Sequence, residues 1–489
     1  MGRLKHETMN GAKWAIIQKC TLQPLMFVYG MVLARLISAE ELGILGLTGI
    51  FFALASSLKE AGMGRAIIRK QDRTDTDLCT VFWFNIVTNI IVCAGFWVAA
   101  PFIAAYFNQP PLTSLTRISA IMMLLNATTS VHSALFSAER NFKTPAIISL
   151  VSTLPTIPIA LTLAYFGWSY WAVVYAGVVS GFLALVLTWC CSPWKPKFKF
   201  SWISFHEFFS FGFKLSLSGF IYSLYLESRK LVIGKFYTPA QLAYYTRADH
   251  LCSMPVLTLQ APLDSIIYPI LSTIQDDTAR LDKVYRQYMR LCLCPIMWVM
   301  LTISCNAEGI VHLLYGPTWL SCVPYARILC IGFAFSTVIR VNHNYLMVKG
   351  RSDLLLRREI ILRTFGLTAM GIGAYFSVLG ICVAFVVESL LNLLLTVTYT
   401  LKISSMKVKE QASDFFPYLI IILFVNIPSI VMEMLHIPFY ISAFLGPGIS
   451  LLLYITILHI RKDEAYNMIV GCITASKAWQ RIRQRFCRG

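Results

Sequence analysis

The sequence has 489 residues, of which 57% are hydrophobic and only 13% are charged. Soluble domains carry about a quarter of charged residues, so this composition excludes an ordinary soluble fold and predicts an integral membrane protein. The formal net charge of +18 does not indicate nucleic-acid binding, because the Lys and Arg residues are scattered between apolar runs. We therefore expect no nucleic acid partner, with membrane lipids surrounding the chain.

The apolar runs predict an all-α, polytopic membrane protein with about 14 transmembrane helices, since each crossing needs about 20 apolar residues. The first run is expected to be retained as a span, because no small-residue cleavage pattern follows it. The predicted spans are residues 12–37, 42–61, 78–104, 112–137, 145–166, 169–192, 208–234, 241–273, 288–313, 321–347, 358–378, 380–401, 415–433 and 438–460.

The distribution of basic residues predicts the orientation. Lys and Arg gather at the N-terminus, in the even-numbered connections between predicted spans and in the C-terminal tail. By the positive-inside rule both termini are cytoplasmic, which requires an even number of spans. Residues 466–486 have the spacing of a basic helix lying on the inner leaflet, and a frayed basic tail is the alternative.

An internal repeat divides the predicted spans into two halves. Residues 35–42 and 235–242 share a pattern of cation, two apolar residues, hydroxyl and final Leu, and Arg117 with Ile118 recurs as Arg327 with Ile328. Each half holds six spans, so the halves are expected to be parallel repeats with a substrate cleft between them. The expected parts are an N-lobe at 1–192 (spans 1–6), a cytoplasmic linker at 193–204, a C-lobe at 205–405 (spans 7–12), spans 13 and 14 at 406–460, and a basic cytoplasmic tail at 461–489.

The cysteines and short motifs do not predict a metal or cofactor site. The fourteen cysteines include no C-x-x-C pair, and His206-Glu207 lacks the second His of a helical zinc site. The sequence also contains no Walker-type glycine loop. We therefore expect no metal, no cofactor, no catalytic centre and no direct use of ATP.

Seven segments resemble a known family. They are LARLISAEELG (33–43), EAGMGRAIIR (60–69), TVFWFN (80–85), IGKF (233–236), LAYYTRA (242–248), YPILS (268–272) and GRSDL (350–354). In these segments the chain is similar to the polysaccharide-unit flippases of the multidrug/oligosaccharidyl-lipid/polysaccharide exporter superfamily, especially the lipopolysaccharide or capsule biosynthesis branch.

The resemblance implies a two-lobed, MATE-like helical fold working by alternating access. Its implied function is to move lipid-pyrophosphate-linked polysaccharide repeat units from the inner to the outer leaflet of a bacterial cytoplasmic membrane. The implied partners are a lipid-linked oligosaccharide substrate and the polysaccharide polymerase machinery.

Polar residues inside the predicted spans are the candidates for substrate binding, because a charge in hydrocarbon costs about 2.5 kcal/mol or more. In span 208–234 they recur at helical spacing and form one stripe, and in span 12–37 two lie one turn apart before Pro24, which is expected to loosen the helix. Cations suit a pyrophosphate and hydroxyl groups suit sugars. The predicted substrate-binding residues are Lys19, Gln23, Lys214, Ser218, Tyr222, Tyr225, Arg229, Lys230 and Arg247.

Two interpretations of these cations are open: they bind substrate, or they pair with Glu227, Asp249 or Asp264 and hold helices together. Glu227 and Asp264 are also candidates for coupling to an ion or proton, with simple ion pairing as the alternative. The remaining intramembrane polar residues are expected to form interhelical hydrogen bonds. These residues are Arg340, Asn342, His343, Asn344 and Glu388.

An ion-coupled multidrug or small-metabolite exporter of the same superfamily is the main alternative function. Its site would favour aromatics and carboxylates over several cations. A membrane enzyme acting on lipid-linked sugars would need a sizeable periplasmic loop with paired polar residues, whereas the predicted outer connections at 108–111, 167–169 and 315–318 are short. We therefore expect a transporter and not an enzyme.

Overall fold

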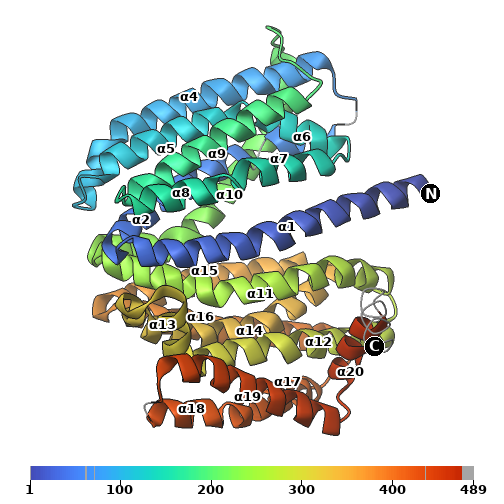
Figure 1. Cartoon of the computed structure of the whole chain (residues 1–489). Helices are drawn as coiled ribbons and strands as arrows, with labels where there is room; N and C mark the ends of the chain where they lie inside the picture. Colours follow the sequence, from blue (N-terminus) through green and yellow to red (C-terminus); the bar gives the residue numbers. More distant parts are fainter. Residues whose placement is uncertain (1, 61–62, 71, 436, 476–489) are drawn as a thin grey trace, which may run out of the picture. The chain divides into compact units, whose positions relative to one another are not determined.

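The computed structural model describes residues 2–60, 63–70, 72–435 and 437–475 (Figure 1). All regular structure within these residues is helical, which confirms the predicted all-α fold class. The chain divides into two compact units, residues 1–243 and 244–489.

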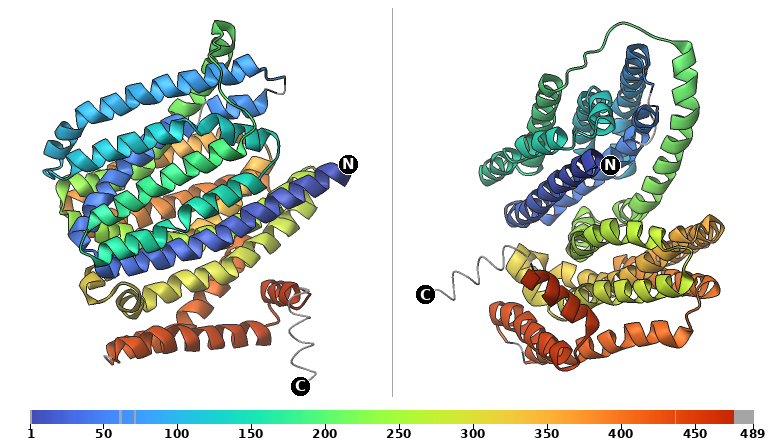
Figure 2. Two further views of the ribbon diagram at one scale, coloured as in Figure 1. Left: turned by 45° about the horizontal axis from the view of Figure 1, so that its top comes forward. Right: turned by 90° about the vertical axis from the view of Figure 1, so that its right-hand side faces the viewer.

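The first unit is built from ten helices among its described residues, followed by the first turn of α11. They are α1 (Gly2–Leu36), α2 (Ala39–Glu60), α3 (Met63–Arg69), α4 (Asp75–Tyr106), α5 (Leu112–Ala127), α6 (Ser130–Ala138), α7 (Lys143–Thr153), α8 (Thr156–Tyr165), α9 (Tyr170–Cys191) and α10 (Trp202–Phe236). The main packed pairs are α4 with α5, α2 with α10, and α9 with α7 and α8. Figure 2 shows the long extended connection, residues 192–201, that joins α9 to α10.

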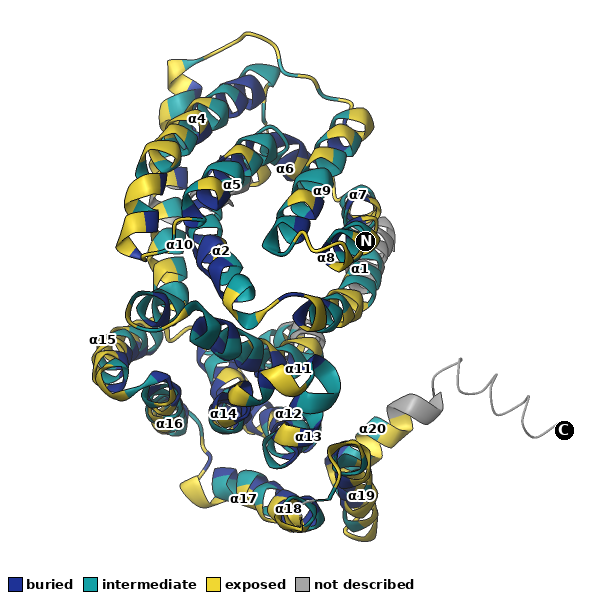
Figure 3. Cartoon of the chain, turned by 60° about the vertical axis from the view of Figure 1, so that its left-hand side comes forward, coloured by how far each residue is buried: buried dark blue, intermediate teal, exposed yellow. Residues whose placement is uncertain are grey.

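The second unit contains the rest of α11 and the remaining helices. They are α11 (Pro239–Thr273), α12 (Thr278–Cys305), α13 (Ala307–Tyr315), the 3-10 helix η1 (Pro317–Cys322), α14 (Val323–Val348), α15 (Ser352–Phe376), α16 (Val378–Ile403), α17 (Val408–Val425), α18 (Ile427–Met434), α19 (Phe439–Ile460) and α20 (Glu464–Ala475). Its core lies on α12 and α14, where Tyr285, Met297 and Tyr345 are almost fully buried. Figure 3 shows the dark-blue buried residues of these two helices and the more exposed residues of α15 and α19.

The described residues contain nine helices long and apolar enough to cross a membrane, or ten if the bent pair α5 and α6 forms one span. These ten correspond to ten of the predicted spans. The other four predicted spans fall on α1, α10, α11 and α15, which are 25 to 35 residues long and more polar. The total of fourteen crossings stays a prediction, and all of the predicted site residues lie on three of these four polar helices.

Several predicted spans are interrupted in the structure. Spans 112–137, 145–166, 288–313 and 415–433 each consist of two consecutive helices, and the break between α5 and α6 bends the chain by 41°. Asn306 and Asn426 stand at two of the breaks, and each side-chain amide donates to the backbone carbonyl four residues earlier. The loosening expected at Pro24 was wrong, because α1 continues through Pro24 to Leu36. A proline removes only one helical hydrogen bond, and flanking turns can hold the helix together.

Local sequence explains where α4 begins. The Thr74 hydroxyl accepts a hydrogen bond from the Asp77 backbone N–H at 3.2 Å, and the Asp77 carboxylate accepts one from the Thr74 N–H at 2.9 Å. This reciprocal capping box satisfies two backbone donors that a helix N-terminus leaves without a partner. It fixes the start of one of the longest apolar helices of the first unit.

Candidate functional site

Helix α10 carries the predicted polar stripe on one face. The helix is continuous from Trp202 to Phe236, so residues 214, 218, 222, 225 and 229 fall within about 80° of arc at about 100° per residue. Ser216 and Gly234 lie about 160° around the helix from the centre of the stripe. The stripe and these two residues therefore occupy opposite faces.

The face opposite the stripe is the one that packs inside the first unit. A Cβ at Gly234 would lie 2.2 Å from a terminal methyl of Leu47 of α2, so the bare backbone here lets Leu47 pack closely on α10. Ser216 lines a small pocket of about 250 Å³ with Asn85 and Asn89 of α4. On the stripe itself, Ser218 is exposed and Tyr222 is 55% exposed. The first unit thus buries one face of α10 and leaves much of the polar face accessible.

Of the other predicted residues of α10, Lys230 shows the internal pairing that was one of the two interpretations. Arg229 and Tyr225 are partly buried on the stripe. Lys230 forms an ion pair with Glu227 at 2.9 Å, as the internal-pairing interpretation expects. The side chain of Lys214 lies outside the part of the chain that the structure describes.

Lys19 and Gln23 lie one turn apart on α1 and both are exposed. Toward its C-terminal end, α1 packs through Leu33 on the α8 and α9 segments, and Ile37, directly after the helix, joins the same apolar cluster. The more N-terminal part of the same helix face therefore presents the two polar side chains instead of apolar ones.

In the second unit, Asp264 of α11 is the centre of a hydrogen-bonded group. Its carboxylate accepts from Nε of Arg340 at 2.5 Å, from the amide of Asn344 at 3.1 Å and from the hydroxyl of Tyr288. Asp264 and the Arg340 side chain remain 18% and 48% exposed. Arg247, further toward the start of α11, lies over the ring of Trp319 with its Cζ 5.9 Å from the ring centroid.

Sequence reasoning named Asp264 but missed Tyr288 as its partner. Arg340 and Asn344 were expected to form interhelical hydrogen bonds, and their contact with Asp264 joins α14 to α11. The only signal for these partners was their polarity within predicted spans. Tyr288 gave no such signal, because a tyrosine in an apolar helix is ordinary.

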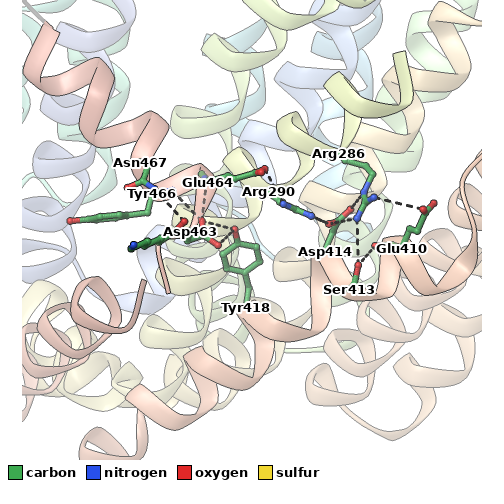
Figure 4. Close-up of polar contacts among 12 residues, drawn as sticks. Arg286, Arg290, Glu410, Ser413, Asp414, Tyr418, Asp463, Glu464, Tyr466 and Asn467 are labelled. Atoms are coloured by element: carbon green, nitrogen blue, oxygen red, sulfur yellow. Dashed lines mark hydrogen bonds and ion pairs between the residues drawn. The ribbon is translucent and has the colours of Figure 1, made fainter. Parts of the chain in front are cut away.

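A second charged cluster connects α12 to the C-terminal helices (Figure 4). Asp414 of α17 is 2% exposed and receives Arg286 Nε at 2.7 Å and Arg290 at 2.6 Å, both from α12. Arg290 also pairs with Glu464 of α20 at 3.0 Å. The Tyr418 hydroxyl donates to Asp463, which precedes α20. These ion pairs connect α17 and α20 to α12, one of the core helices of the second unit.

A cation in the first unit is held in a similar way outside the apolar spans. Lys70 Nζ lies 2.8 Å from Glu207 and 3.1 Å from Asp77. The hydrogen bond to Glu207 is the main cause that raises the pKa of Lys70. Among the described residues, no group of three His, Cys, Asp or Glu side chains is placed to hold a metal ion.

The fold and its apolar helices define a class: an all-helical, multi-pass membrane protein. The chain belongs to the family of polysaccharide biosynthesis proteins, whose family model matches residues 32–324. This confirms the resemblance seen in the seven sequence segments.

Two relatives agree with this assignment, and one solved structure shares the fold. The chain is 23% identical to the teichuronic acid biosynthesis protein TuaB of Bacillus subtilis (strain 168), over 81% of this chain and 82% of that protein. It is 22% identical to the lipopolysaccharide biosynthesis protein WzxC of Escherichia coli (strain K12), over 80% of each chain. The lipid II flippase MurJ in an inward closed conformation matches with a TM-score of 0.67 and 12% identity, over 92% of this chain and 99% of that chain. At that identity the structural likeness shows the fold alone.

Proposed function

We propose that this protein is a flippase for lipid-pyrophosphate-linked polysaccharide repeat units, moving them from the inner to the outer leaflet of the bacterial cytoplasmic membrane by alternating access. Membership of the polysaccharide biosynthesis family and the similarity to the teichuronic acid and lipopolysaccharide biosynthesis proteins support this class of substrate. The observation that carries the proposal is the polar face of α10, which lies opposite the face packed into the first unit. A polar face of this length is unfavourable against lipid and suits a wet path for a charged headgroup.

The residues have separate roles in this proposal. Lys19, Lys214, Arg229, Lys230 and Arg247 bind the pyrophosphate through charge-assisted hydrogen bonds, while Gln23, Ser218, Tyr222 and Tyr225 bind sugar groups. Glu227 and Asp264 couple transport to an ion or proton. Each of the two carboxylates is paired with a cation, so protonation or ion binding would release Lys230 or Arg340.

The proposal also includes an orientation and a division into lobes. Both termini are cytoplasmic, the N-lobe comprises residues 1–192 and the C-lobe residues 205–405. The distribution of Lys and Arg among the connections supports this orientation. The chain has no chemical step of its own in this scheme, and polymerase machinery would use the delivered repeat unit.

Reconstitution in proteoliposomes tests the proposal. The probe is a fluorescent lipid-pyrophosphate oligosaccharide, and its transfer between leaflets is followed with a membrane-impermeant quencher. Arg229→Ala and Lys19→Ala should each slow transfer about 10-fold or more, the effect of losing one hydrogen bond to a charged group. The site assignment is wrong if both variants insert normally and translocate like the parent.

Lys235→Ala is the matched control on the same helix. Lys235 donates to the Tyr106 carbonyl at 2.6 Å and lies on a different face of α10 from the stripe. Its removal should leave transfer unchanged. Export of a cationic dye driven by a sodium or proton gradient, without transfer of the lipid-linked probe, would instead identify a multidrug exporter.

A further inference from the structure

The helices that follow the C-lobe contribute to a pocket that contains none of the predicted site residues. It has a volume of about 270 Å³ and lies where α13, α18 and α19 meet beyond the end of α12. We call it the α13–α19 pocket and define it by six of its lining residues. They are Asn306, Glu308, His312, Ser429, Glu433 and Phe439.

The pocket contains polar groups that are not used by the fold. Ser429 is 2% exposed, and its hydroxyl has no hydrogen-bond partner among the described residues. Buried hydroxyl groups normally have a partner, so this one is available to a group that enters the pocket. Glu308 presents an exposed carboxylate at the same pocket. Glu433 is partly neutralised, because Arg327 pairs with it.

A glycine keeps two oxygens of the pocket side by side. A Cβ on Gly446 of α19 would lie 2.1 Å from Asn306 Oδ1 and 3.0 Å from Ser429 Oγ. Both oxygens therefore face the same bare stretch of backbone, one from the break between α12 and α13 and the other from α18. The absence of a side chain at position 446 preserves this polar corner.

An aromatic surface completes the pocket. The rings of His312 and Phe439 stack with their centroids 3.6 Å apart and their planes 27° apart. Phe439 remains 37% exposed. The negative face of an aromatic ring attracts the weakly positive C–H groups of a sugar face, while carboxylate, amide and hydroxyl groups bind the sugar hydroxyls.

We propose that the α13–α19 pocket binds one sugar ring, neutral or amino-substituted, of the repeat unit that the protein exports. This inference rests on the proposed function. The acidic side chains disfavour a uronic acid, because its carboxylate would be repelled by Glu308. In the proposed orientation the pocket lies on the outer side, at the connection between the last two spans, so it receives the sugar after translocation. Spans 13 and 14 thereby gain a role in release.

Saturation-transfer NMR on the full chain in detergent tests the pocket directly. The probes are methyl galactoside and methyl N-acetylglucosaminide, with methyl glucuronide as the acidic comparison. The neutral probes should give transfer signals, and Glu308→Gln should raise their Kd about 10-fold, because a charged hydrogen-bond acceptor is lost. Phe439→Ala should abolish the signals. If Phe439→Ala does not fold, Glu308→Gln alone decides the result, since Glu308 is exposed.

Tyr440→Ala is the matched control, because Tyr440 is the neighbouring aromatic residue, is 54% exposed and does not line the pocket. The Tyr440→Ala variant should bind the neutral glycosides with the same Kd as the parent. The proposal is overturned if no neutral glycoside binds, if both pocket variants bind like the parent, or if the glucuronide binds best.

The leaflet-transfer assay on the same preparations separates this inference from the proposed function. If the parent protein translocates the lipid-linked probe but binds no glycoside, the proposed function is supported and sugar binding in the α13–α19 pocket is contradicted. Glycoside binding that depends on Glu308 and Phe439, without any translocation, supports the pocket and overturns the flippase proposal.

Discussion

At the scale of single residues, Asp414 stabilises the second unit more than any exposed acidic residue can. Its carboxylate is 2% exposed and balances Arg286 and Arg290. Asp414→Asn leaves two arginines without their shared counter-charge, and breaking a buried pair in this way costs about 3 kcal/mol. We expect a clearly lower melting temperature in detergent, measured by thermal unfolding.

The matched control is Asp353→Asn. Asp353 pairs with Arg351 through two hydrogen bonds of 2.9 and 2.8 Å, and about half of its side chain is exposed. The hydrogen bond from Arg351 lowers the pKa of Asp353 to about 2, so the pair stays ionised at the assay pH. Solvent screens such a pair, and the melting temperature should not change. Equal melting temperatures for both variants and the parent would contradict the structural role of Asp414.

At the residue scale, the sequence indicated which polar residues share a helix face but not which residues they contact. The spacing along α10 placed Arg229, Tyr222 and Ser218 on one face, because helical geometry is periodic. Partner choice depends on how helices far apart in the chain approach each other. Asp264 was therefore identified, whereas its contact with Tyr288 was not.

At the scale of elements, α15 and α16 depend on two glycines at their crossing. A Cβ on Gly373 would lie 2.4 Å from the Gly380 carbonyl oxygen, and a Cβ on Gly380 would lie 2.4 Å from the Gly373 carbonyl oxygen. Because backbone atoms cannot move aside easily, Gly373→Ala must push the two helices apart. We expect a lower melting temperature in detergent.

Gly371→Ala provides the control for this helix. It lies two residues away in α15, and a Cβ there would meet nothing within 4 Å. Alanine favours a helix over glycine by about 1 kcal/mol, so this variant should be neutral or slightly stabilised. A destabilised Gly371→Ala, or an unaffected Gly373→Ala, would mean that close approach does not hold these helices together.

The broken spans are the feature of the elements that hydropathy did not predict. Apolar composition indicates how long a membrane segment is, and it located the segments that became α5 with α6, α7 with α8, and α17 with α18. A break between two helices leaves the apolar composition of the segment unchanged. The position of the break depends on single residues such as Asn426, whose side-chain amide donates to the backbone at the end of α17.

At the scale of the whole molecule, the fold class and the family followed from composition and from seven short segments. So few charged residues exclude an ordinary soluble fold. In a membrane protein, the thickness of the bilayer then sets the length of each spanning helix. Composition and short motifs do not determine where one lobe ends and the next begins. The repeat places α10 with the C-lobe, while the structure packs α10 against α2, α3 and α4 of the first unit.

The proposed topology can be tested with reporters, because it rests on the placement of positive charge. Moving a cluster of Lys and Arg across the membrane opposes the membrane potential by about 2.3 kcal/mol for each charge per 100 mV. The basic connections and the C-terminal tail should therefore stay in the cytoplasm. A green fluorescent protein fused after Gly489 should fluoresce, and a cysteine replacing exposed Thr318 should react with an impermeant maleimide in intact spheroplasts. A cysteine replacing exposed Ser352 should react only after permeabilisation. An odd number of crossings would reverse one of these results and invalidate the even count on which the two-lobe assignment depends.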